Sequence, residues 1–288
     1  MVSIVADSTC DLSQELLDKY KVKMIPLHIL LGEKEYEDGV DLRPEEIYAW
    51  ADDHKTTPKT SAPSVETVMQ TFRPLLDKGD DIVCFSISES MSTTANVMRL
   101  AARQLEAEDR IIVVDSANLS TGIGLLVLEA ARMALQGKTA EEIVAETERL
   151  KPKVRASFVV DTLTYLHRGG RCNGLEAMAG SMLKLHPKIV VSEGKMSSSK
   201  KYRGKIDKVI LAYAKDMEEQ LLQARKERVF ITHSGCPEKT VLMVEQYLQS
   251  LSRFDEILIT RAGGVISSHC GPGTLGVLFI AGEETVGF

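Results

Sequence analysis

The chain has 288 residues, with 35 basic and 41 acidic side chains that give a net charge of −6. Nucleic-acid-binding proteins and polybasic membrane-binding segments carry a basic excess, so this balance argues against both. The length predicts about two domains. Hydrophobic residues make up 44% of the chain but aromatic residues only 5%, so we expect an aliphatic core.

The cysteines and the apolar runs indicate where the protein resides. Five cysteines form no Cys-x-x-Cys pair and stand at positions 10, 84, 172, 236 and 270. This odd number predicts reduced thiols in the cytoplasm. The first apolar run ends at Asp7 after a handful of residues, so we expect no secretory signal peptide. The longest apolar region, residues 121–135, contains Glu129 and Arg132, so we expect no transmembrane segment.

The first half of the chain alternates short aliphatic runs with longer amphipathic stretches. We predict strands over residues 2–6, 24–31, 82–87 and 111–115. Helices are expected to begin near Asp11, Arg43, Ser64, Thr93, Ser120 and Thr139, and residues 55–63 are expected to be a loop. This alternation predicts a parallel sheet with helices on both faces. We take residues 1–152 as an N-terminal three-layer domain that ends near Pro152.

The second half has a different pattern. A hairpin is predicted around Glu193-Gly194-Lys195, with strands over residues 188–192 and 196–202. Further strands are predicted over residues 157–160, 229–232, 257–260 and 275–281. Helices are predicted before Gly169, near residues 175–183, over residues 206–221 and from Pro237. A hairpin beside crossover helices indicates a mixed sheet, so residues 153–288 form a second α/β domain in this interpretation.

Three strands end in Asp followed by a hydroxyl residue: Asp7-Ser8, Asp115-Ser116 and Asp161-Thr162. The pattern is typical of a helix cap or an Asx turn. The carboxyl ends of strands are also where α/β folds bind ligands, in a crevice.

Several familiar enzyme motifs are missing or out of context. Gly271-Pro-Gly273-Thr-Leu-Gly276 matches Gly-x-Gly-x-x-Gly, but it leads into a strand-like run and lacks the acidic residue expected about twenty positions later. A tight backbone turn beside a ligand head group fits this segment better. The sequence has no phosphate-binding loop with Lys and Ser/Thr and no Gly-x-Ser-x-Gly, and its six histidines are scattered. We therefore expect neither a metal nor a cofactor.

Hydroxyl-rich loops are the strongest chemical signal. Thr60 and Ser61 lie in a proline-bracketed loop before a helix, and Ser92 lies between a strand and a helix start. A helix start offers free N–H groups, so these loops are suited to a carboxylate or a phosphate, although capping alone also explains them.

Two arginines and one histidine have both a structural and a functional interpretation. Arg171 follows a predicted helix cap and Arg203 lies at a predicted strand edge. Both are also able to bind a phosphate with two N–H groups. His269 precedes the Gly-Pro-Gly turn, where a structural role is the simpler interpretation.

Five motifs in order resemble one family. They are Val5-Ala-Asp7-Ser8-Thr9-Cys-Asp11-Leu12, Thr60-Ser61-x-Pro63-Ser64, Ser92-x-Thr94, Leu163-x-Tyr165-Leu166-x-x-Gly169-Gly170-Arg171 and His269-x-Gly271-Pro272-Gly273. Together they resemble the DegV family, which includes the fatty-acid-binding subunits of bacterial fatty acid kinases. The resemblance extends over essentially the whole chain.

The resemblance implies two α/β domains with a long-chain fatty acid, of palmitate to stearate length, in a tunnel between them. The carboxylate would meet Thr60, Ser61 and Ser92, with Thr93 beside them and His269 in the same network. Arg171 and Arg203 would serve acyl phosphorylation by a separate ATP-binding kinase subunit, whose acyl phosphate product enters phospholipid synthesis. This chain would present the substrate and would carry no catalytic residue of its own.

The sequence departs from the family pattern at several positions. Thr93-Thr94-Ala95 replaces Gly-Thr-Tyr after the serine, Ala62 replaces Gln, and His186-Pro187-Lys188 replaces Lys-Pro-Ile. These changes bear on chain-length preference and on the choice of partner. Two alternative functions stay open: a substrate-binding subunit for a small carbonyl compound, as in dihydroxyacetone kinases, and a regulatory lipid sensor.

Overall fold

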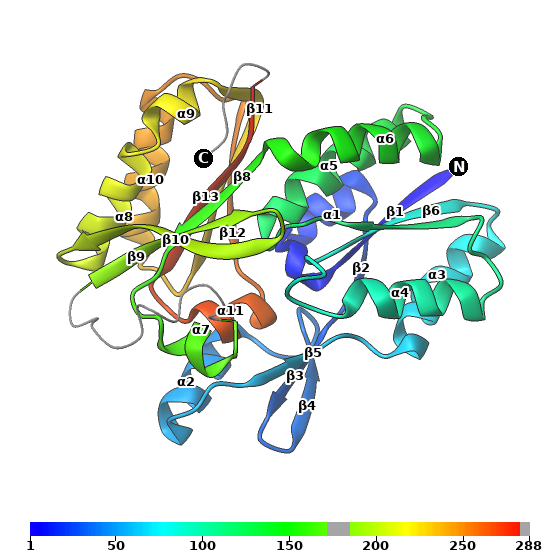
Figure 1. Cartoon of the computed structure of the whole chain (residues 1–288), viewed down its shortest axis with the longest axis horizontal. Helices are drawn as coiled ribbons and strands as arrows, with labels where there is room; N and C mark the ends of the chain where they lie inside the picture. Colours follow the sequence, from blue (N-terminus) through cyan, green and yellow to red (C-terminus); the bar gives the residue numbers. More distant parts are fainter. Residues whose placement is uncertain (172–184, 283–288) are drawn as a thin grey trace.

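The computed structural model describes residues 1–171 and 185–282, and the strands in these ranges form three sheets (Figure 1). A parallel sheet is built from the first half and a mixed sheet from the second, which confirms the predicted α/β fold class. The helical segment predicted near residues 175–183 lies outside the described residues.

The first sheet is parallel, four-stranded and buried on both faces. In order across the sheet its strands are β2 (Lys23–Ile25), β1 (Val2–Asp7), β6 (Asp81–Ser86) and β7 (Ile111–Asp115). One face packs on α3 (Val65–Asp77) and α4 (Thr94–Gln104). The other face packs on α1 (Gln14–Tyr20), α5 (Thr121–Leu135) and α6 (Ala140–Leu150). Burial on both faces explains the nearly continuous aliphatic runs of these strands.

Local capping sets where most of these helices begin. Ser64 caps α3, and Thr139 with Glu142 forms a capping box at α6, both as predicted. The cap predicted at Asp11 is wrong: Ser13 caps α1, and a 3₁₀ turn, η1 (Ser8–Cys10), comes before it. Asp11 has a left-handed backbone, with φ of 51°, and its carboxyl group bonds elsewhere.

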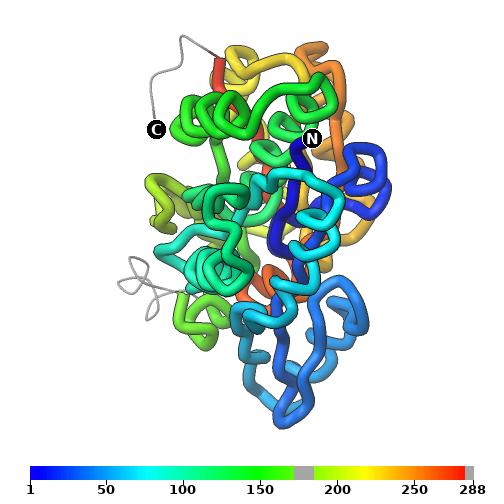
Figure 2. Tube along the Cα trace, turned by 90° about the vertical axis from the view of Figure 1, so that its right-hand side faces the viewer, coloured from blue at the N-terminus to red at the C-terminus, as the bar shows by residue number. Residues whose placement is uncertain are grey.

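A small antiparallel sheet corrects two predictions. The strand predicted over residues 24–31 is two strands in different sheets, β2 and β3 (His28–Leu31), separated at Pro26, which has no N–H for a strand ladder. The loop predicted over residues 55–63 contains β5 (Lys59–Ser61), which pairs with β3, and β4 (Lys34–Glu37) pairs with β3 on the other side. Figure 2 shows this sheet and α2 (Pro44–His54), in blue, together at one end of the molecule.

The second large sheet has six strands. In order they are β10 (Lys195–Arg203), β9 (Leu185–Ser192), β8 (Val154–Val159), β13 (Thr274–Ala281), β11 (Ala224–Ser234) and β12 (Glu256–Arg261). The β11–β12 pair is parallel and the other pairs are antiparallel. One face packs on α8 (Ile206–Lys215), α9 (Glu218–Leu222) and α10 (Glu238–Ser250). The other face contacts α5, so α5 lies between the two large sheets (Figure 1).

Two short helices complete the region between the sheets. They are α7 (Thr164–Arg168) and α11 (Gly264–Cys270), and the second was not predicted. A 3₁₀ turn, η2 (Lys151–Lys153), connects α6 to β8. α11 contacts α2, β3 and β5 of the first half and α7 of the second, so it connects the two halves of the chain. The division into domains at residue 152 stays a prediction. Within the described ranges, no helix combines the length and the apolar character needed to cross a bilayer.

Candidate functional site

A cavity of about 520 Å³ lies where the two halves meet, and residues of both line it. Its volume is within the range of small-molecule sites. Most of the lining surface is apolar. The larger apolar side chains are aliphatic apart from one phenylalanine, and they are Leu27, Ile87, Met91, Leu119, Phe158, Leu166, Met196, Val265, Ile266 and Leu278. This lining is suited to an apolar ligand.

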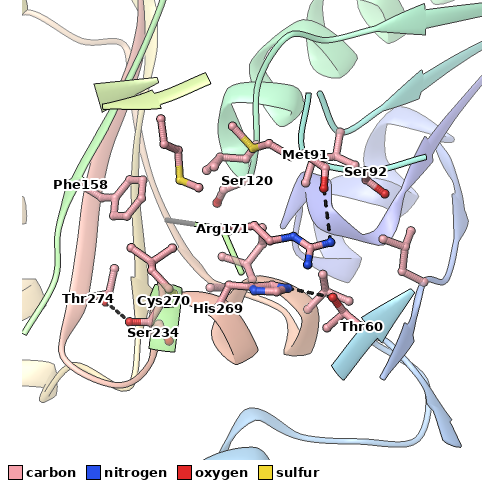
Figure 3. A pocket seen from close by; sticks show the side chains of 18 of the residues that line it. Thr60, Met91, Ser92, Ser120, Phe158, Arg171, Ser234, His269, Cys270 and Thr274 are labelled. Atoms are coloured by element: carbon pink, nitrogen blue, oxygen red, sulfur yellow. Dashed lines mark hydrogen bonds between the residues drawn. The ribbon is translucent and has the colours of Figure 1, made fainter. Parts of the chain in front are cut away.

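One end of the cavity gathers polar side chains, and we call it the head-group end. It comprises Thr60, Ser92, Arg171 and His269, which are labelled in Figure 3, together with the lining residues Ser61 and Thr93, which follow Thr60 and Ser92 in the sequence. These are six of the seven residues that the sequence singled out. The seventh, Arg203, is exposed at the end of β10 and is not among the lining residues.

Thr60 and His269 meet across the cavity from opposite parts of the chain. Thr60 lies on β5 and His269 on α11, and the Thr60 Oγ1–His269 Nε2 distance is 2.8 Å. The other ring nitrogen, Nδ1, is buried without a hydrogen-bond partner among the described residues. The pKa of His269 is lowered to about 4, mainly because the ring is buried and secondly because Arg171 carries a positive charge. The imidazole is therefore neutral at pH 7.

Gly169 allows the imidazole this position. A Cβ atom at residue 169 would lie 2.3 Å from His269 Nδ1. The Gly169-Gly170 pair, interpreted from the sequence as a helix cap, therefore has a second role, because only a residue without a side chain leaves room for the ring.

The start of α4 supplies donors to the same end. Ser92 Oγ is 2.8 Å from Thr94 Oγ1 and accepts a hydrogen bond from the Thr94 N–H. Thr93, the N-cap residue, makes no side-chain capping bond, and the first turn has no acidic residue. A helix start of this kind attracts negative charge. Of the positions that depart from the family pattern, Ala62 and Thr93 line the cavity, and Ala95 is a fully buried residue of α4.

Arg171 brings a positive charge into this end. Its Nη1 donates to the Gly169 carbonyl at 2.8 Å and its Nη2 to the Met91 carbonyl at 3.5 Å. In Figure 3 the guanidinium lies between Ser92 and Thr60. No carboxylate of the described residues forms an ion pair with it. The sequence grouped Arg171 with Arg203, but the structure brings only Arg171 into the cavity lining.

Sequence reasoning missed a second polar surface of the cavity, which we call the hydroxyl wall: Thr232, Ser234 and Thr274. Thr232 Oγ1 lies 2.6 Å from Thr121 Oγ1 and 2.9 Å from Thr260 Oγ1. Ser234 Oγ lies 2.6 Å from the Tyr48 hydroxyl. The alternation Thr232-x-Ser234 at the end of a strand was the available signal.

The Gly-Pro-Gly segment makes a close turn from α11 into β13. Gly271 has a φ of 72°, and a Cβ atom there would lie 2.5 Å from the ring of Tyr165. A strand follows the segment, where a dinucleotide fingerprint needs a helix. Within residues 1–171 and 185–282, no group of three or more His, Cys, Asp or Glu side chains is arranged to hold a metal ion.

Comparisons with known proteins agree with this fold. A family model described as "Uncharacterised protein, DegV family" matches residues 1–282. A DegV domain-containing protein from Caldanaerobacter subterraneus subsp. tengcongensis is 32% identical over 278 residues, which cover 96% of this chain and 98% of the relative.

Solved structures of relatives concern fatty acids. A DegV family protein from Thermus thermophilus, described for its fatty acid binding, has a TM-score of 0.89 and 32% identity, covering 97% of this chain and 99% of its own. A stearic acid-binding protein from Eubacterium ventriosum has a TM-score of 0.85 and 30% identity, covering 99% and 100%. The family match and the shared fold extend over nearly the whole sequence, and this chain belongs to the DegV family.

Proposed function

We propose that this protein binds a long-chain fatty acid, with the tail in the aliphatic part of the cavity and the carboxylate at the head-group end. One observation carries the proposal. An aliphatic cavity of about 520 Å³ has, at one end, a guanidinium group without a carboxylate partner among the described residues. That combination matches a molecule with one negative group on a long apolar chain. The fatty acids bound by the Thermus and Eubacterium relatives support the same ligand class.

The apolar lining supplies most of the affinity. Burial of one methylene group contributes about 0.8 kcal/mol, so roughly 14 of them offer about 11 kcal/mol before ordering costs. A triose would use only the polar end and would leave the aliphatic lining without a ligand contact. This difference favours a fatty acid over the small carbonyl compound considered above.

The head-group end recognises the carboxylate through neutral donors and one cation. Thr60, Ser61, Ser92 and Thr93 offer hydroxyl groups, and the start of α4 offers N–H groups. His269 stays neutral at pH 7 and so adds a hydrogen-bonding group without charge. Hydrogen bonds to a charged group are the stronger ones, which favours the ionised acid over an ester.

We further propose that the chain presents the carboxylate to a separate ATP-binding kinase subunit, which forms the acyl phosphate. Arg171 would neutralise the growing negative charge at the head group, and Arg203, exposed on β10, would contact the partner. The proposal also includes the division into two domains at residue 152, with the ligand between them. It includes a cytoplasmic location too, which the free thiols of Cys10, Cys84, Cys236 and Cys270 favour.

Lipid extraction of the purified protein followed by mass spectrometry tests the ligand class. We expect fatty acids of about 16 to 18 carbons, and tight binding of added palmitate to the delipidated protein. Absence of acyl chains together with no binding of added palmitate would refute the proposal. Stabilisation by a triose analogue but not by fatty acids would favour the small carbonyl compound.

Addition of an ATP-dependent fatty acid kinase subunit tests the second step. We expect acyl phosphate to form from the bound acid, and Arg203→Ala to impair this step while palmitate binding stays unchanged. Tight binding of palmitate without phosphorylation by any such partner would favour a lipid sensor.

A further inference from the structure

Three carboxyl groups are buried close together beside the turn that follows β1. They belong to Asp7, Asp11 and Asp38, whose side chains are almost entirely inaccessible. Burial raises the pKa of each group, and repulsion from the neighbouring carboxyl groups contributes to the rise for Asp7 and Asp11; the pKa of Asp7 reaches about 6. A buried carboxyl group is costly unless hydrogen bonds satisfy it, so its partners reveal what it holds in place.

Two of these carboxyl groups bond to the start of α11. Asp11 Oδ1 accepts a hydrogen bond from the Gly263 N–H at 2.8 Å, and Asp38 Oδ1 accepts one from the Gly264 N–H at 2.6 Å. Gly263 is the N-cap residue of α11, and it has no side chain with which to cap the helix. The caps come instead from residues that are 252 and 226 positions earlier in the chain.

The same two groups hold other walls of the cavity. Asp11 Oδ2 accepts a hydrogen bond from Ser120 Oγ at 2.5 Å, and Ser120 lines the cavity. Asp38 Oδ2 accepts one from Ser8 Oγ at 2.8 Å, and Ser8 Oγ in turn accepts from the N–H of the lining residue Leu27 at 3.1 Å. The carboxyl groups therefore connect α11 to two first-half segments that line the cavity.

The start of α11 fits tightly against its surroundings. A Cβ atom at residue 264 would lie 2.5 Å from Ile29 and 3.0 Å from Asp38 Oδ1. A Cβ atom at residue 263 would lie 3.2 Å from a carboxyl oxygen of both Asp11 and Asp38. Any displacement of the helix start changes these contacts, and His269 lies in the same short helix.

We propose that Asp11 and Asp38 are positioning residues for the head-group end: they fix the start of α11 and thereby the place of His269 opposite Thr60. The inference rests on the proposed function, because its readout is the recognition of a fatty acid carboxylate. Two buried acids of the first half, Asp11 and Asp38, would thus align the imidazole of His269, which belongs to the second half.

Paired binding measurements on the full chain test the proposal. Palmitate and hexadecanol have the same apolar tail but differ in head-group charge, so the ratio of their dissociation constants reports on the head-group end. Asp38→Ala removes the acceptor for the Gly264 N–H, and we expect about tenfold weaker palmitate binding with less than about a twofold change for hexadecanol. Asp38→Asn keeps an acceptor oxygen and should restore the ratio to nearly the wild-type value.

A milder variant keeps the test valid if Asp38→Ala does not fold. Gly263→Ala retains both carboxyl groups and a backbone that alanine accepts, since φ at residue 263 is −65°, but it moves the helix start by a few tenths of an ångström. We expect a shift of the His269 imidazole NMR signals and a smaller loss of palmitate selectivity. Unchanged signals and an unchanged ratio in this variant would overturn the proposal.

The control is Asp80→Ala. Asp80 is also buried, but its side chain accepts a hydrogen bond from Ser3 Oγ at 2.9 Å and pairs with the Met1 amino group rather than with the start of α11. The Asp80→Ala variant should lower the free energy of unfolding and leave the ratio of the palmitate and hexadecanol dissociation constants unchanged. Equal weakening of both ligands in Asp38→Ala would show a general structural role and would also overturn the proposal, whereas a wild-type protein that binds neither ligand would refute the proposed function instead.

Discussion

The head-group end and the hydroxyl wall both carry serine and threonine hydroxyl groups, but they differ in what their polar groups bond to. In Figure 3, Ser234 and Thr274 lie on one side of the cavity and Thr60 and Ser92 on the other. Thr232 and Ser234 bond to other hydroxyl groups of the protein. At the head-group end, neither the Arg171 guanidinium nor His269 Nδ1 is fully paired. Among the described residues, the guanidinium has no carboxylate partner and Nδ1 has no hydrogen-bond partner. Unused bonding capacity, rather than the number of hydroxyl groups, distinguishes a ligand site from a polar wall.

The largest expected effect comes from removal of the cation. Arg171→Ala should weaken palmitate binding roughly 100-fold, since a hydrogen bond to a charged group is worth up to about 3 kcal/mol. Hexadecanol binding should change little. Thermal stability should fall only slightly, because the variant loses the hydrogen bonds to the Gly169 and Met91 carbonyls but leaves no described carboxylate without a partner. Isothermal titration with both ligands measures this difference, and Arg168→Ala, an exposed arginine nearby, is the matched control. Equal losses for the acid and the alcohol would remove Arg171 from carboxylate recognition.

The next largest effect is expected in the pH dependence of stability, through the neutral imidazole of His269. Because the pKa of His269 is lowered from 6.5 to about 4, its contribution to stability is complete above pH 6.5 and is lost as the pH falls toward 4. The difference in unfolding free energy between wild type and His269→Gln should shrink by about 2.5 kcal/mol from pH 7.5 to pH 4.5. Urea titrations at the two pH values measure it. The exposed His167→Gln should give no such convergence, and a pH-independent difference for His269→Gln would contradict a neutral buried ring.

Crowding of the imidazole should have a smaller effect. Gly169→Ala would place its Cβ atom 2.3 Å from His269 Nδ1, so the ring must move relative to Thr60. We expect about tenfold weaker palmitate binding, comparable to the loss of one good hydrogen bond. Gly170→Ala separates strain from contact: its φ of 68° is unfavourable for alanine, but no atom lies within 4 Å of the new Cβ. If both variants weaken binding equally, backbone strain and not the ring contact is responsible.

The smallest effect on binding is expected at the hydroxyl wall. Ser234→Ala should change palmitate affinity by less than about twofold and lower the unfolding free energy by about 1 kcal/mol, because its hydroxyl bonds to Tyr48 rather than to a ligand. Parallel titration and thermal unfolding separate the two quantities. A tenfold loss of affinity would mean that the wall contacts the ligand and that the comparison between the two polar surfaces fails.

Much of the fold could be predicted from the sequence because it depends on local signals. Aliphatic runs marked the strands of the parallel sheet, and Ser64 and Thr139 marked helix starts through bonds to their own first turns. α11 escaped prediction because its cap is not local: Gly263 carries no capping group, and the bonds come from Asp11 and Asp38. The strand predicted over residues 24–31 was wrong because Pro26 divides it between two sheets.

The site was partly predictable for a related reason. Hydroxyl residues at loop and helix starts drew attention to Thr60 and Ser92, both of which line the cavity. Their association with His269 depends on a contact across 209 positions, which no spacing in the sequence reveals. The difference between Arg171 and Arg203 likewise depends on tertiary structure, since both are arginines beside a glycine.

The position of β13 in the six-stranded sheet has a consequence for how the protein is made. β13 is the last strand of the described chain, yet it lies in the middle of the sheet, between β8 and β11. A ribosome releases the chain from its N-terminus, so the four-stranded parallel sheet can form while synthesis continues. The six-stranded sheet remains in two separate parts until residues 274–281 emerge. α11 emerges just before this strand, so the binding cavity is completed only after the other strands of both large sheets have been synthesised.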